Sequence, residues 1–425
     1  MTFETAVPGE RAYLVGLDRA DARLDGEDSL EELAALAAAA GAAVVGRTLQ
    51  KRRDPDPSTY VGKGKAYELK AEMARLNAEL LITDDELRPR QQRELEKVTG
   101  LRVIDRSAVI LDIFAKHART QEGKLQVELA QLEYRLPRLS GVGKEMSRLG
   151  GGINTRGPGE TKLESDRQVI RKRIQELRAR LGEVAKQRER SRRQRSGEGL
   201  FLAALVGYTN AGKSTLLNAL AGSDVFVADQ PFATLDPTTR RVTLSSGTIA
   251  LLSDTVGFVN KLPPTLVAAF RATLEELDDA GLLVHVADVA HPNLHERIAV
   301  VNDTLASLKL ADRPSLLVLH QVDRLTGAEG SGLREALEAE FPRAVFVSAR
   351  SGEGLDALRE AIAVAARSGW RAVNVTLPHE AGAYVQRIRE RGSLKRADYR
   401  ERGIEIEADV PASLAAELEA RATAS

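Results

Sequence analysis

The sequence has 425 residues, which is enough for two to four domains. Hydrophobic residues make up 43% of it and charged residues 29%, a composition typical of a globular protein. Lys plus Arg and Asp plus Glu each number 61, a balance that argues against coating nucleic acid over the whole surface and leaves room for a local basic patch.

The chain contains no cysteine, so disulfides and cysteine-ligated zinc or iron–sulfur sites are excluded. Its first residues, MTFETAVPGERAYLV, lack a basic segment followed by an apolar core, and we expect no signal peptide. The longest apolar stretch, Leu33–Gly46, contains Gly41 and is too short to span a bilayer. It predicts the end of a helix, a glycine cap and a buried strand. We therefore expect a cytoplasmic protein with no membrane span.

Short apolar runs alternate with helical patterns at the start of the chain, which predicts a parallel sheet. The apolar runs are Ala12–Leu17, Ala42–Gly46, Glu79–Asp84 and Leu101–Asp105. The helical patterns include SLEELAALAAAA and RPRQQRELEKV. We assign residues 1–115 to an N-terminal α/β domain. Within it, the segment YVGKGKAYELK leaves three interpretations open: phosphate binding, a basic helix start that faces RNA, or a plain turn, which is the commonest of the three.

Two amphipathic helices follow, and together they predict an antiparallel hairpin over residues 116–196. The apolar positions are Leu125, Leu129, Leu132 and Leu136 in the first helix and Leu163, Ile170, Ile174, Leu177, Leu181 and Val184 in the second. The glycine-rich stretch RLGGGINTRGPGETKLE lies at the tip between them. Six cations and two acids lie between Arg135 and Lys162, which favours contact with RNA phosphates over a plain connector. The basic run Arg188–Arg195 fits a solvated helix end slightly better than an RNA contact.

The segment GYTNAGKST predicts a phosphate-binding loop, because it matches G-x-x-x-x-G-K-[ST] between an apolar strand and a helical pattern. Backbone N–H groups and the helix N-terminus would face the phosphates. Lys213 would reach the β- and γ-phosphates, and Ser214 would ligate Mg²⁺. A chance match in a loop is the alternative, and the flanking strand and helix disfavour it. We assign residues 197–367 to this domain.

Further motifs follow in order along the same domain. Asp254 and Gly257 form D-x-x-G, where we expect the carboxylate to hold Mg²⁺ through water and the glycine N–H to bond the γ-phosphate. Thr234, in the polar loop DQPFATLDPTTR, is expected to complete the metal shell. Asp323 ends the strand SLLVLHQVD, and the strand AVFV leads into Ser348–Arg350. The final residues, 368–425, predict a small α+β domain ordered strand, helix, strand, helix.

This ordered set of motifs resembles the translation-factor-related GTPases. The resemblance implies that Asp323 accepts hydrogen bonds from guanine N1 and N2 and that the backbone N–H of Ala349 meets O6. The sequence departs from the family's N-K-x-D motif, because HQVD places His320 and Gln321 where Asn and Lys are usual. We expect weaker guanine binding and leave open competition by other purines. Whether His320 only fills the strand end without touching the ligand also stays open.

Phe258 is a second departure, because many small GTPases have a Gln after D-x-x-G to orient the attacking water. Phenylalanine cannot hydrogen-bond water, so another group must do so. By resemblance to cation-dependent GTPases, Asn210 would hold K⁺; alternatively, a partner supplies the contact. The predicted catalytic residues are Lys213, Asn210, Thr234 and Gly257, and the predicted metal ligands are Ser214, Thr234 and Asp254. The predicted nucleotide-binding residues are Gly207, Tyr208, Thr209, Asn210, Ala211, Gly212, Lys213, Ser214, Thr215, Phe232, Thr234, Asp254, Gly257, His320, Gln321, Asp323, Ser348, Ala349 and Arg350.

Longer motifs resemble the HflX family of GTPases over residues 11–367. They are ELRPRQQRELE, DRSAVILDIFAKHARTQEGKLQVELAQLEYRLPRL, GGINTRGPGETKLESDR and PFATLDPTTR. The resemblance implies a fold with an N-terminal parallel α/β unit, a helical hairpin, a P-loop GTPase domain and a small C-terminal α+β segment. It also implies a GTP hydrolase that binds the large ribosomal subunit, with some members splitting stalled ribosomes during stress, and ATP use by the N-terminal region in some relatives.

In that family the hairpin tip approaches the peptidyl-transferase RNA, so Arg148, Arg156 and Lys162 are expected to contact rRNA. We expect a monomer with GTP, GDP and Mg²⁺ as ligands. Two alternative functions stay open. One is an ATP- or GTP-dependent RNA-remodelling enzyme, and the other is a ribosome anti-association factor with little catalysis.

Overall fold

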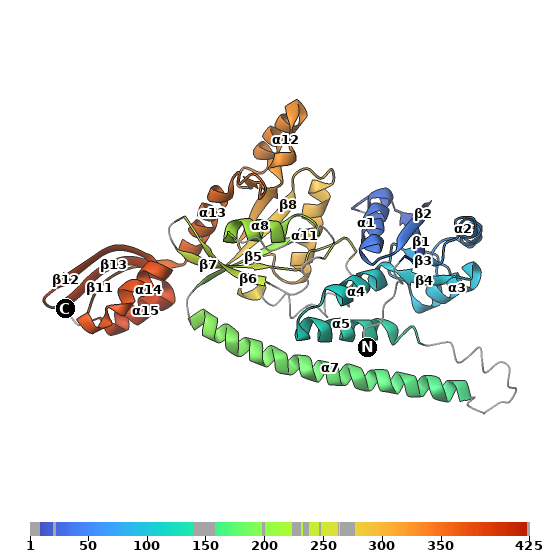
Figure 1. The fold of residues 1–425 in the computed structure, drawn as a ribbon, viewed down its shortest axis with the longest axis horizontal. Helices are drawn as coiled ribbons and strands as arrows, with labels where there is room; N and C mark the ends of the chain where they lie inside the picture. Colours follow the sequence, from blue (N-terminus) through green and yellow to red (C-terminus); the bar gives the residue numbers. More distant parts are fainter. Residues whose placement is uncertain are drawn as a thin grey trace. The chain divides into compact units, whose positions relative to one another are not determined.

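The computed structural model describes residues 9–19, 23–139, 158–197, 200–222, 231–232, 238–245, 248–261, 263 and 277–422 (Figure 1). The chain divides into two compact units. The N-terminal unit comprises Met1–Lys186, Gln230–Asp236 and Val259–Ala272. The second unit comprises Gln187–Asp229, Pro237–Phe258 and Thr273–Ser425. No helix within the described ranges combines the length and the apolar character needed to cross a membrane.

The N-terminal unit contains a four-stranded parallel sheet with the strand order β2-β1-β3-β4, as the alternating pattern predicts. The strands are β1 (Arg11–Asp18), β2 (Ala43–Lys51), β3 (Leu80–Thr83) and β4 (Arg102–Asp105). The helices are α1 (Gly26–Ala39), α2 (Lys63–Arg75), α3 (Pro89–Thr99) and α4 (Arg106–His117). β3 is buried at every position, whereas β2 is an edge strand with exposed residues, so the prediction of a buried strand after Gly41 is wrong.

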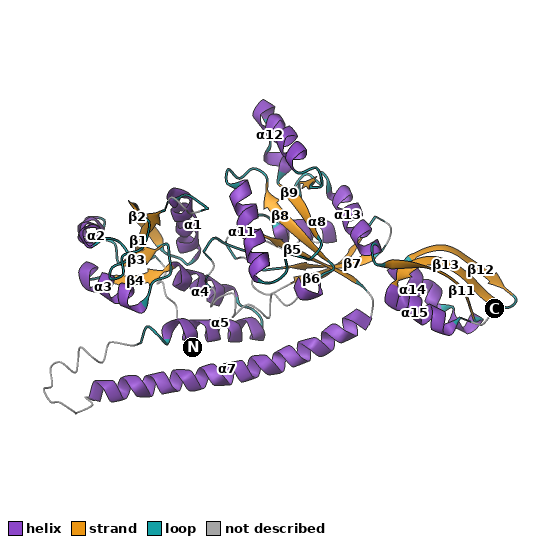
Figure 2. Cartoon of the chain, turned by 180° about the vertical axis from the view of Figure 1, so that it is seen from behind, coloured by secondary structure: helices purple, strands orange, loops and turns teal. Residues whose placement is uncertain are grey.

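The two amphipathic helices form the predicted hairpin as α5 (Gln121–Arg135) and α7 (Pro158–Gly197). Figures 1 and 2 show the two helices running in opposite directions. Their seams meet in one cluster, whose members are Leu125, Leu129, Leu132, Leu136, Ile170, Ile174, Leu177 and Leu181. Both seams have the same 4-3-4 spacing, so each apolar side chain of α5 has a counterpart on α7. Arg173 adds two hydrogen bonds of 2.8 and 3.0 Å to the Glu128 carboxylate.

The second unit contains a six-stranded mixed sheet with the order β10-β9-β8-β5-β7-β6. Its strands are β5 (Phe201–Gly207), β6 (Thr238–Thr243), β7 (Ile249–Asp254), β8 (Leu282–Asp288), β9 (Ser315–His320) and β10 (Val345–Val347). β6 alone in this sheet runs antiparallel, and the sequence did not predict it. The helices are α8 (Lys213–Ala221), α11 (Leu294–Ser307), η2 (Val322–Arg324), α12 (Gly327–Glu340) and α13 (Leu355–Arg367).

β5 is buried on both faces of this sheet, as expected for the central strand of an α/β domain. Ala203 and Leu205 lie in the cluster that includes α8 and α13. Ala204 and Val206 lie in the cluster that includes α11. The carboxyl end of β5, where the phosphate-binding loop begins, is therefore held in place from both sides.

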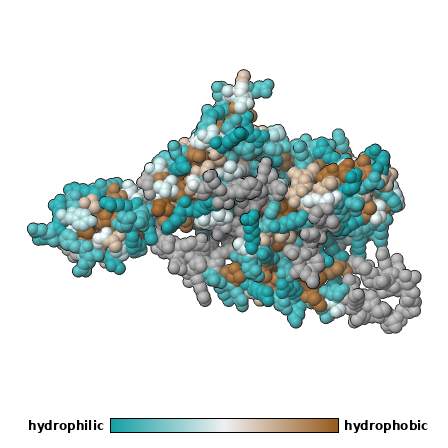
Figure 3. All heavy atoms as spheres, in the orientation of Figure 1, coloured by the Kyte–Doolittle hydropathy of each residue, from teal (hydrophilic) through white to brown (hydrophobic). Residues whose placement is uncertain are grey.

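The C-terminal segment is a three-stranded antiparallel sheet, β11-β13-β12, with two helices over its apolar face (Figure 2). Its elements are β11 (Trp370–Leu377), η3 (His379–Ala381), α14 (Ala383–Arg391), β12 (Ser393–Arg400), β13 (Gly403–Pro411) and α15 (Ala412–Arg421). The sequence did not predict β12, because SLKRADYR is largely charged. Its cations pair across the sheet instead, as in Lys395–Asp409 and Arg400–Glu405. Polar residues cover most of this segment on the face drawn in Figure 3.

Candidate nucleotide-binding site

The loop between β5 and α8 has the backbone that a phosphate cradle requires. Gly212 caps the N-terminus of α8 in the left-handed conformation, with φ of +87°. A side chain at Gly212 would not fit, because a Cβ there would lie 2.5 Å from the His320 ring. No side-chain hydrogen bond caps α8, and the N–H groups of a first helical turn have no acceptor within the helix. Such an end attracts anions.

Lys213 is buried, and its Nζ donates hydrogen bonds to the carbonyl oxygens of Gly207 (3.1 Å) and Tyr208 (2.9 Å). Burial lowers the pKa of Lys213 to about 8, against the attraction of the nearby Asp254 carboxylate. Burial destabilises the charged form of this ammonium group, and an anion beside it would stabilise that form. The two carbonyl contacts hold Nζ at the loop, where a bound phosphate would supply such an anion.

The side chains expected to ligate magnesium converge at the ends of two elements. The Ser214 hydroxyl at the start of α8 donates to Asp254 Oδ2 at the end of β7, over 2.5 Å. Both are hard oxygen ligands, which suit Mg²⁺. Across the described part of the chain, no three His, Asp or Glu side chains gather as an all-protein metal site. The donor set thus fits a Mg²⁺ ion that takes its remaining ligands from phosphate and water.

The D-x-x-G loop pairs directly with the phosphate-binding loop. The Thr209 N–H donates to the Phe258 carbonyl (2.8 Å), and the Phe258 N–H donates to the Gly207 carbonyl (3.0 Å). A Cβ added at Gly257 would lie 2.8 Å from Thr209 Cγ2 and 3.1 Å from Lys213 Nζ. A side chain at this position would therefore collide with Thr209 and crowd Lys213. The Phe258 ring is buried in the α11 core cluster and faces no open solvent.

Three loops meet on the side expected to bind the base. Ser348 donates a hydrogen bond to Asp323 Oδ1 (2.6 Å) and accepts from the N–H groups of Arg350 (3.2 Å) and Ser351 (3.1 Å). One hydroxyl therefore fixes both the aspartate and the turn that follows β10. His320 contacts this turn as well: its Nε2 lies 3.3 Å from the N–H of Ala349.

His320 also reaches the phosphate-binding loop, since its Nδ1 lies 3.0 Å from the Ala211 carbonyl. Gln321 follows with a left-handed backbone (φ of +68°), and its side chain accepts a hydrogen bond from Arg324 (2.8 Å). His320 therefore does more than fill the strand end, because both ring nitrogens contact loop backbone atoms, while contact of the ring with nucleotide stays a prediction. HQVD marked the position of His320, but the two contacts could not be predicted from it, since the three loops are distant along the chain.

Some predicted site residues lie elsewhere or outside the description. Thr234, Arg148 and Arg156 lie outside the described residues, as does the side chain of Lys162. Phe232 is buried in the N-terminal unit, where its ring meets Phe114 edge-on at 4.6 Å between centroids. Its ring is therefore occupied by packing, and the prediction that it binds nucleotide gains no support from this contact.

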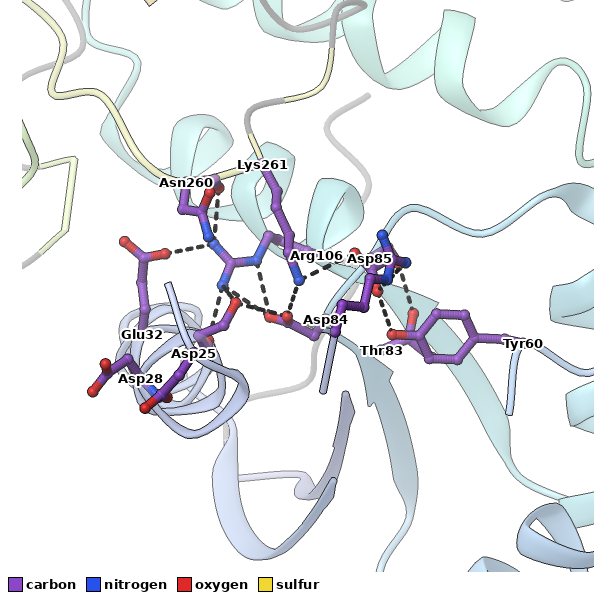
Figure 4. A network of polar contacts seen from close by, with 12 residues as sticks. Asp25, Asp28, Glu32, Tyr60, Thr83, Asp84, Asp85, Arg106, Asn260 and Lys261 are labelled. Carbon is purple, nitrogen blue, oxygen red and sulfur yellow. Dashed lines mark hydrogen bonds and ion pairs between the residues drawn. The ribbon is translucent and has the colours of Figure 1, made fainter. Parts of the chain in front are cut away.

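A buried ionic cluster at the carboxyl edge of the N-terminal sheet was not foreseen from the sequence (Figure 4). Arg106, at the start of α4, is 1% exposed. It donates to Asp84 (2.9 Å), to Glu32 (2.7 Å) and to the carbonyl of Asn260 (3.0 Å). Lys261 pairs with the same Asp84 and, at 3.1 Å, with Asp85. We call these residues the Arg106 cluster.

The Arg106 cluster binds the segment that follows the D-x-x-G loop. Asn260 and Lys261 come three and four residues after Gly257, and they belong to the N-terminal unit. Burial would raise the pKa of Asp84, but the charges of Arg106 and Lys261 outweigh it and lower the pKa to about 2. The carboxylate thus stays ionised and keeps this segment attached to the sheet edge.

Comparisons with known proteins agree with this geometry. A family model described as GTP-binding GTPase N-terminal matches residues 27–115, and one described as GTP-binding GTPase middle region matches residues 117–195. A third, described as 50S ribosome-binding GTPase, matches residues 202–321.

Similar whole proteins include the GTPase HflX of Caldanaerobacter subterraneus subsp. tengcongensis, 46% identical over 96% of this chain and 92% of the relative. The GTPase HflX of Escherichia coli K12 is 43% identical over 85% of this chain and 84% of its own. Among solved structures, a GTP-binding protein of Sulfolobus solfataricus in complex with GDP is 25% identical, with a TM-score of 0.41 over 84% of this chain and 98% of that one. On the strength of the sequence matches, the chain belongs to the HflX family and is a P-loop GTP hydrolase.

Proposed function

We propose that this GTP hydrolase binds the large ribosomal subunit in the cytoplasm, that its nucleotide state controls the binding, and that it splits or rescues stalled ribosomes under stress. The description of the family model over residues 202–321 supports the ribosomal partner. The observation that carries the proposal is the backbone pairing between Phe258 and the phosphate-binding loop. Through these hydrogen bonds, loss of the γ-phosphate would alter the position of the D-x-x-G loop and of the residues that follow it, up to Lys261.

The residues of the site take distinct roles in this proposal. Lys213 and the N–H groups at the start of α8 bind the β- and γ-phosphates. The Gly257 N–H meets the γ-phosphate. Asp323, oriented by Ser348, accepts from the two guanine donors. Adenine cannot offer both donors, so the carboxylate favours GTP over ATP.

Bound Mg²⁺ would neutralise charge on the β- and γ-phosphates. Ser214 and Asp254 are the described residues placed to hold it, with Asp254 acting through water. Thr234 is the third candidate ligand from the sequence. These hard oxygen groups would order the loops around the triphosphate, and loss of the γ-phosphate would release them.

Positioning of the attacking water requires a group other than Phe258, whose ring is buried. Asn210 is exposed in the phosphate-binding loop, with φ of +59°. Its amide oxygen is available to a K⁺ ion next to the phosphates; the alternative is a contact from the ribosome. Hydrolysis by the isolated chain should therefore be slow in Na⁺. Fast turnover in Na⁺ without ribosomes would contradict both routes.

The partner contact is assigned to the hairpin tip. The sequence there carries Arg148, Arg156 and Lys162, and cations dominate affinity for RNA. A loop at the end of two packed helices suits entry toward the peptidyl-transferase RNA. Of the six cations from Arg135 to Lys162, Arg138 is hydrogen-bonded within the N-terminal unit to Asp105 (2.9 Å), so we leave it out of the proposed RNA contact.

Sedimentation with purified ribosomal subunits tests the proposal most directly. We expect the protein to pellet with large subunits in a non-hydrolysable GTP analogue and to release in GDP, while small subunits leave it in the supernatant. GTP hydrolysis should rise when large subunits are added. Absence of cosedimentation in every nucleotide state would falsify the ribosomal partner. Binding without stimulated hydrolysis would favour the anti-association factor.

A further inference from the structure

One side chain, His320, connects the two halves of the nucleotide site. It ends β9, its ring is 3% exposed, and it stands between the phosphate-binding loop and the turn after β10. Nδ1 lies 3.0 Å from the Ala211 carbonyl oxygen, and Nε2 lies 3.3 Å from the Ala349 N–H. The Gly212 backbone packs against the ring so closely that an added Cβ would lie 2.5 Å from two of its atoms.

These partners fix the form of the ring. A carbonyl oxygen only accepts a hydrogen bond, so Nδ1 must carry the proton. A backbone amide only donates, so Nε2 must be bare. The neutral Nδ1–H tautomer alone satisfies both contacts. The imidazole thus offers one donor and one acceptor, the same pair that an asparagine amide offers at this place in N-K-x-D.

We propose that His320 is a positioning residue of the guanine-nucleotide site, whose neutral ring ties the Ala211 carbonyl to the Ala349 N–H and so holds the phosphate and base subsites at a fixed separation. This inference rests on the proposed GTP site. The Ala349 N–H is the one expected to meet guanine O6, and the ring places it there before the base arrives. A site held in its bound form loses less entropy when the nucleotide binds.

The residues that follow His320 also connect it to the base-binding side of the site. Gln321 takes the left-handed conformation directly after His320, and the backbone then enters η2 with Asp323. Asp323 is bonded in turn to Ser348. The left-handed geometry is unfavourable for a residue with a side chain, and its presence at a ligand site marks a constraint that the surroundings maintain. Loss of the ring contacts would release this turn.

Protonation of His320 at low pH provides a separate test of the inference. Burial lowers the pKa of His320 below 6.5, opposed by the Ala211 carbonyl and by the charges of Asp288 and Asp323. Arg324, which pairs with Asp288 at 3.2 Å, offsets part of that attraction. Two cations are adjacent in sequence to residues that contact the ring: Lys213 follows Gly212, and Arg350 follows Ala349.

A protonated ring would turn an Nε2–H toward the Ala349 N–H, and the two donors would repel. Nucleotide affinity should therefore fall only at a pH below the ordinary titration range of histidine, once the ring binds a proton. At neutral pH the ring is uncharged and makes both contacts, and affinity should be independent of this group.

The test measures GDP affinity by calorimetry for the full-length protein, His320→Asn and His320→Ala. At pH 7.5, Ala should weaken binding roughly ten- to thirtyfold through two lost hydrogen bonds, whereas Asn should stay within about threefold of the original. From pH 7.5 down to the lowest pH at which both proteins stay folded, the original protein should lose affinity relative to His320→Asn, since the two share every other titrating group. His295→Asn serves as a control, because His295 is exposed and contacts Glu340 and Phe341, which are not residues of the nucleotide site.

Two results would overturn the inference: equal affinity of His320→Ala and the original protein at pH 7.5, or the same pH profile for the original and His320→Asn. The pH comparison uses only the conservative variant, so it stands even if His320→Ala does not fold. Failure of cosedimentation with tight GDP binding would sink the ribosomal function and leave this inference intact. Absence of guanine-nucleotide binding by the original protein would sink both.

Discussion

At the scale of single residues, guanine selectivity depends on Asp323. The carboxylate is oriented by a 2.6 Å hydrogen bond from Ser348 and is expected to accept two guanine N–H groups. Asp323→Asn should weaken GTP and GDP binding by at least tenfold, because a hydrogen bond to a charged group contributes about 1.5–3 kcal/mol. Xanthine has an oxygen in place of the 2-amino group, which repels the carboxylate but accepts a hydrogen bond from an amide, so the same variant should gain affinity for xanthosine nucleotides.

Competition calorimetry with GTP, XTP and ATP measures this exchange of preferences. Asp312→Asn is the matched control, since Asp312 is exposed in the turn before β9 and lies outside the motif. If Asp323→Asn bound GTP as tightly as the original protein, the base would be recognised elsewhere, and the proposed roles of Asp323 and Ala349 would be wrong.

Residue spacing predicted contacts of one kind and missed another. P-loop chemistry is local, so Gly207 to Ser214 could be found from consecutive letters. The ring contacts of His320 and the partners of Arg106 join residues that are tens to more than a hundred positions apart. The periodicity of apolar residues in the sequence does not indicate such long-range contacts. The replacement of Asn by His in HQVD was the only signal, and it indicated the position without indicating the two bonds.

At the scale of elements, the Arg106 cluster attaches the segment after the D-x-x-G loop to β3 and α4. Arg106→Met would remove the guanidinium that pairs with Asp84 and Glu32, while Asp84 would keep Lys261 and the Ser29 hydroxyl. Removing one member of a buried ion pair costs about 3–5 kcal/mol. We expect a loss of about 3 kcal/mol in the stability of this sheet. Hydrogen–deuterium exchange of β3 and β4 peptides measures it.

Arg102→Met provides the comparison for that loss. Arg102 pairs with Glu10 at the surface of the same unit, and surface pairs contribute about 0–1 kcal/mol. Its exchange rates should stay close to the original. Equal protection in the two variants would mean that the buried cluster contributes no more than a surface ion pair.

The same cluster predicts an acid-labile sheet. The folded-state pKa of Asp84 is about 2, below the ordinary value of 3.8. A depressed carboxyl pKa stabilises the fold above the unfolded value, and this contribution is lost as the pH falls from about 4 to about 2. The shift corresponds to about 2 kcal/mol. Denaturant titrations at pH 7, 4 and 3 should show a steeper loss for the original protein than for Asp84→Asn. Parallel slopes would assign the acid sensitivity to other carboxylates.

Elements with a strong apolar period were predictable, and those shaped by tertiary context were not. The seams of α5 and α7 are complete in the sequence, and the hairpin follows from them. β12 is charged along its length and becomes a strand only because β13 offers an antiparallel partner. β2 has an apolar start but lies at a sheet edge, so its apolar letters do not imply burial. Pairing partners and edge positions are properties of the whole sheet.

At the scale of the whole molecule, the proposal separates nucleotide binding from RNA binding along the chain. Replacing Arg148, Arg156 and Lys162 by Ala should weaken cosedimentation with large subunits and leave GDP affinity unchanged. Each lost phosphate contact lowers the slope of log affinity against log salt by about 0.7–0.9, so the slope should fall by about 2–3. Asp323→Asn should weaken GDP affinity, and the salt dependence of cosedimentation should stay unchanged when the nucleotide is saturating.

A matched variant distinguishes a specific tip from a general effect of charge. Arg371, Arg389 and Arg402 are exposed cations of the C-terminal segment, and replacing them by Ala removes the same three charges. If the tip contacts RNA, only the tip variant shows the reduced slope, because counterions are released only where cations meet phosphates. Equal slopes for the two variants would show that net charge alone attracts the subunit, and the role assigned to the hairpin tip would fall while the GTP site remained as described.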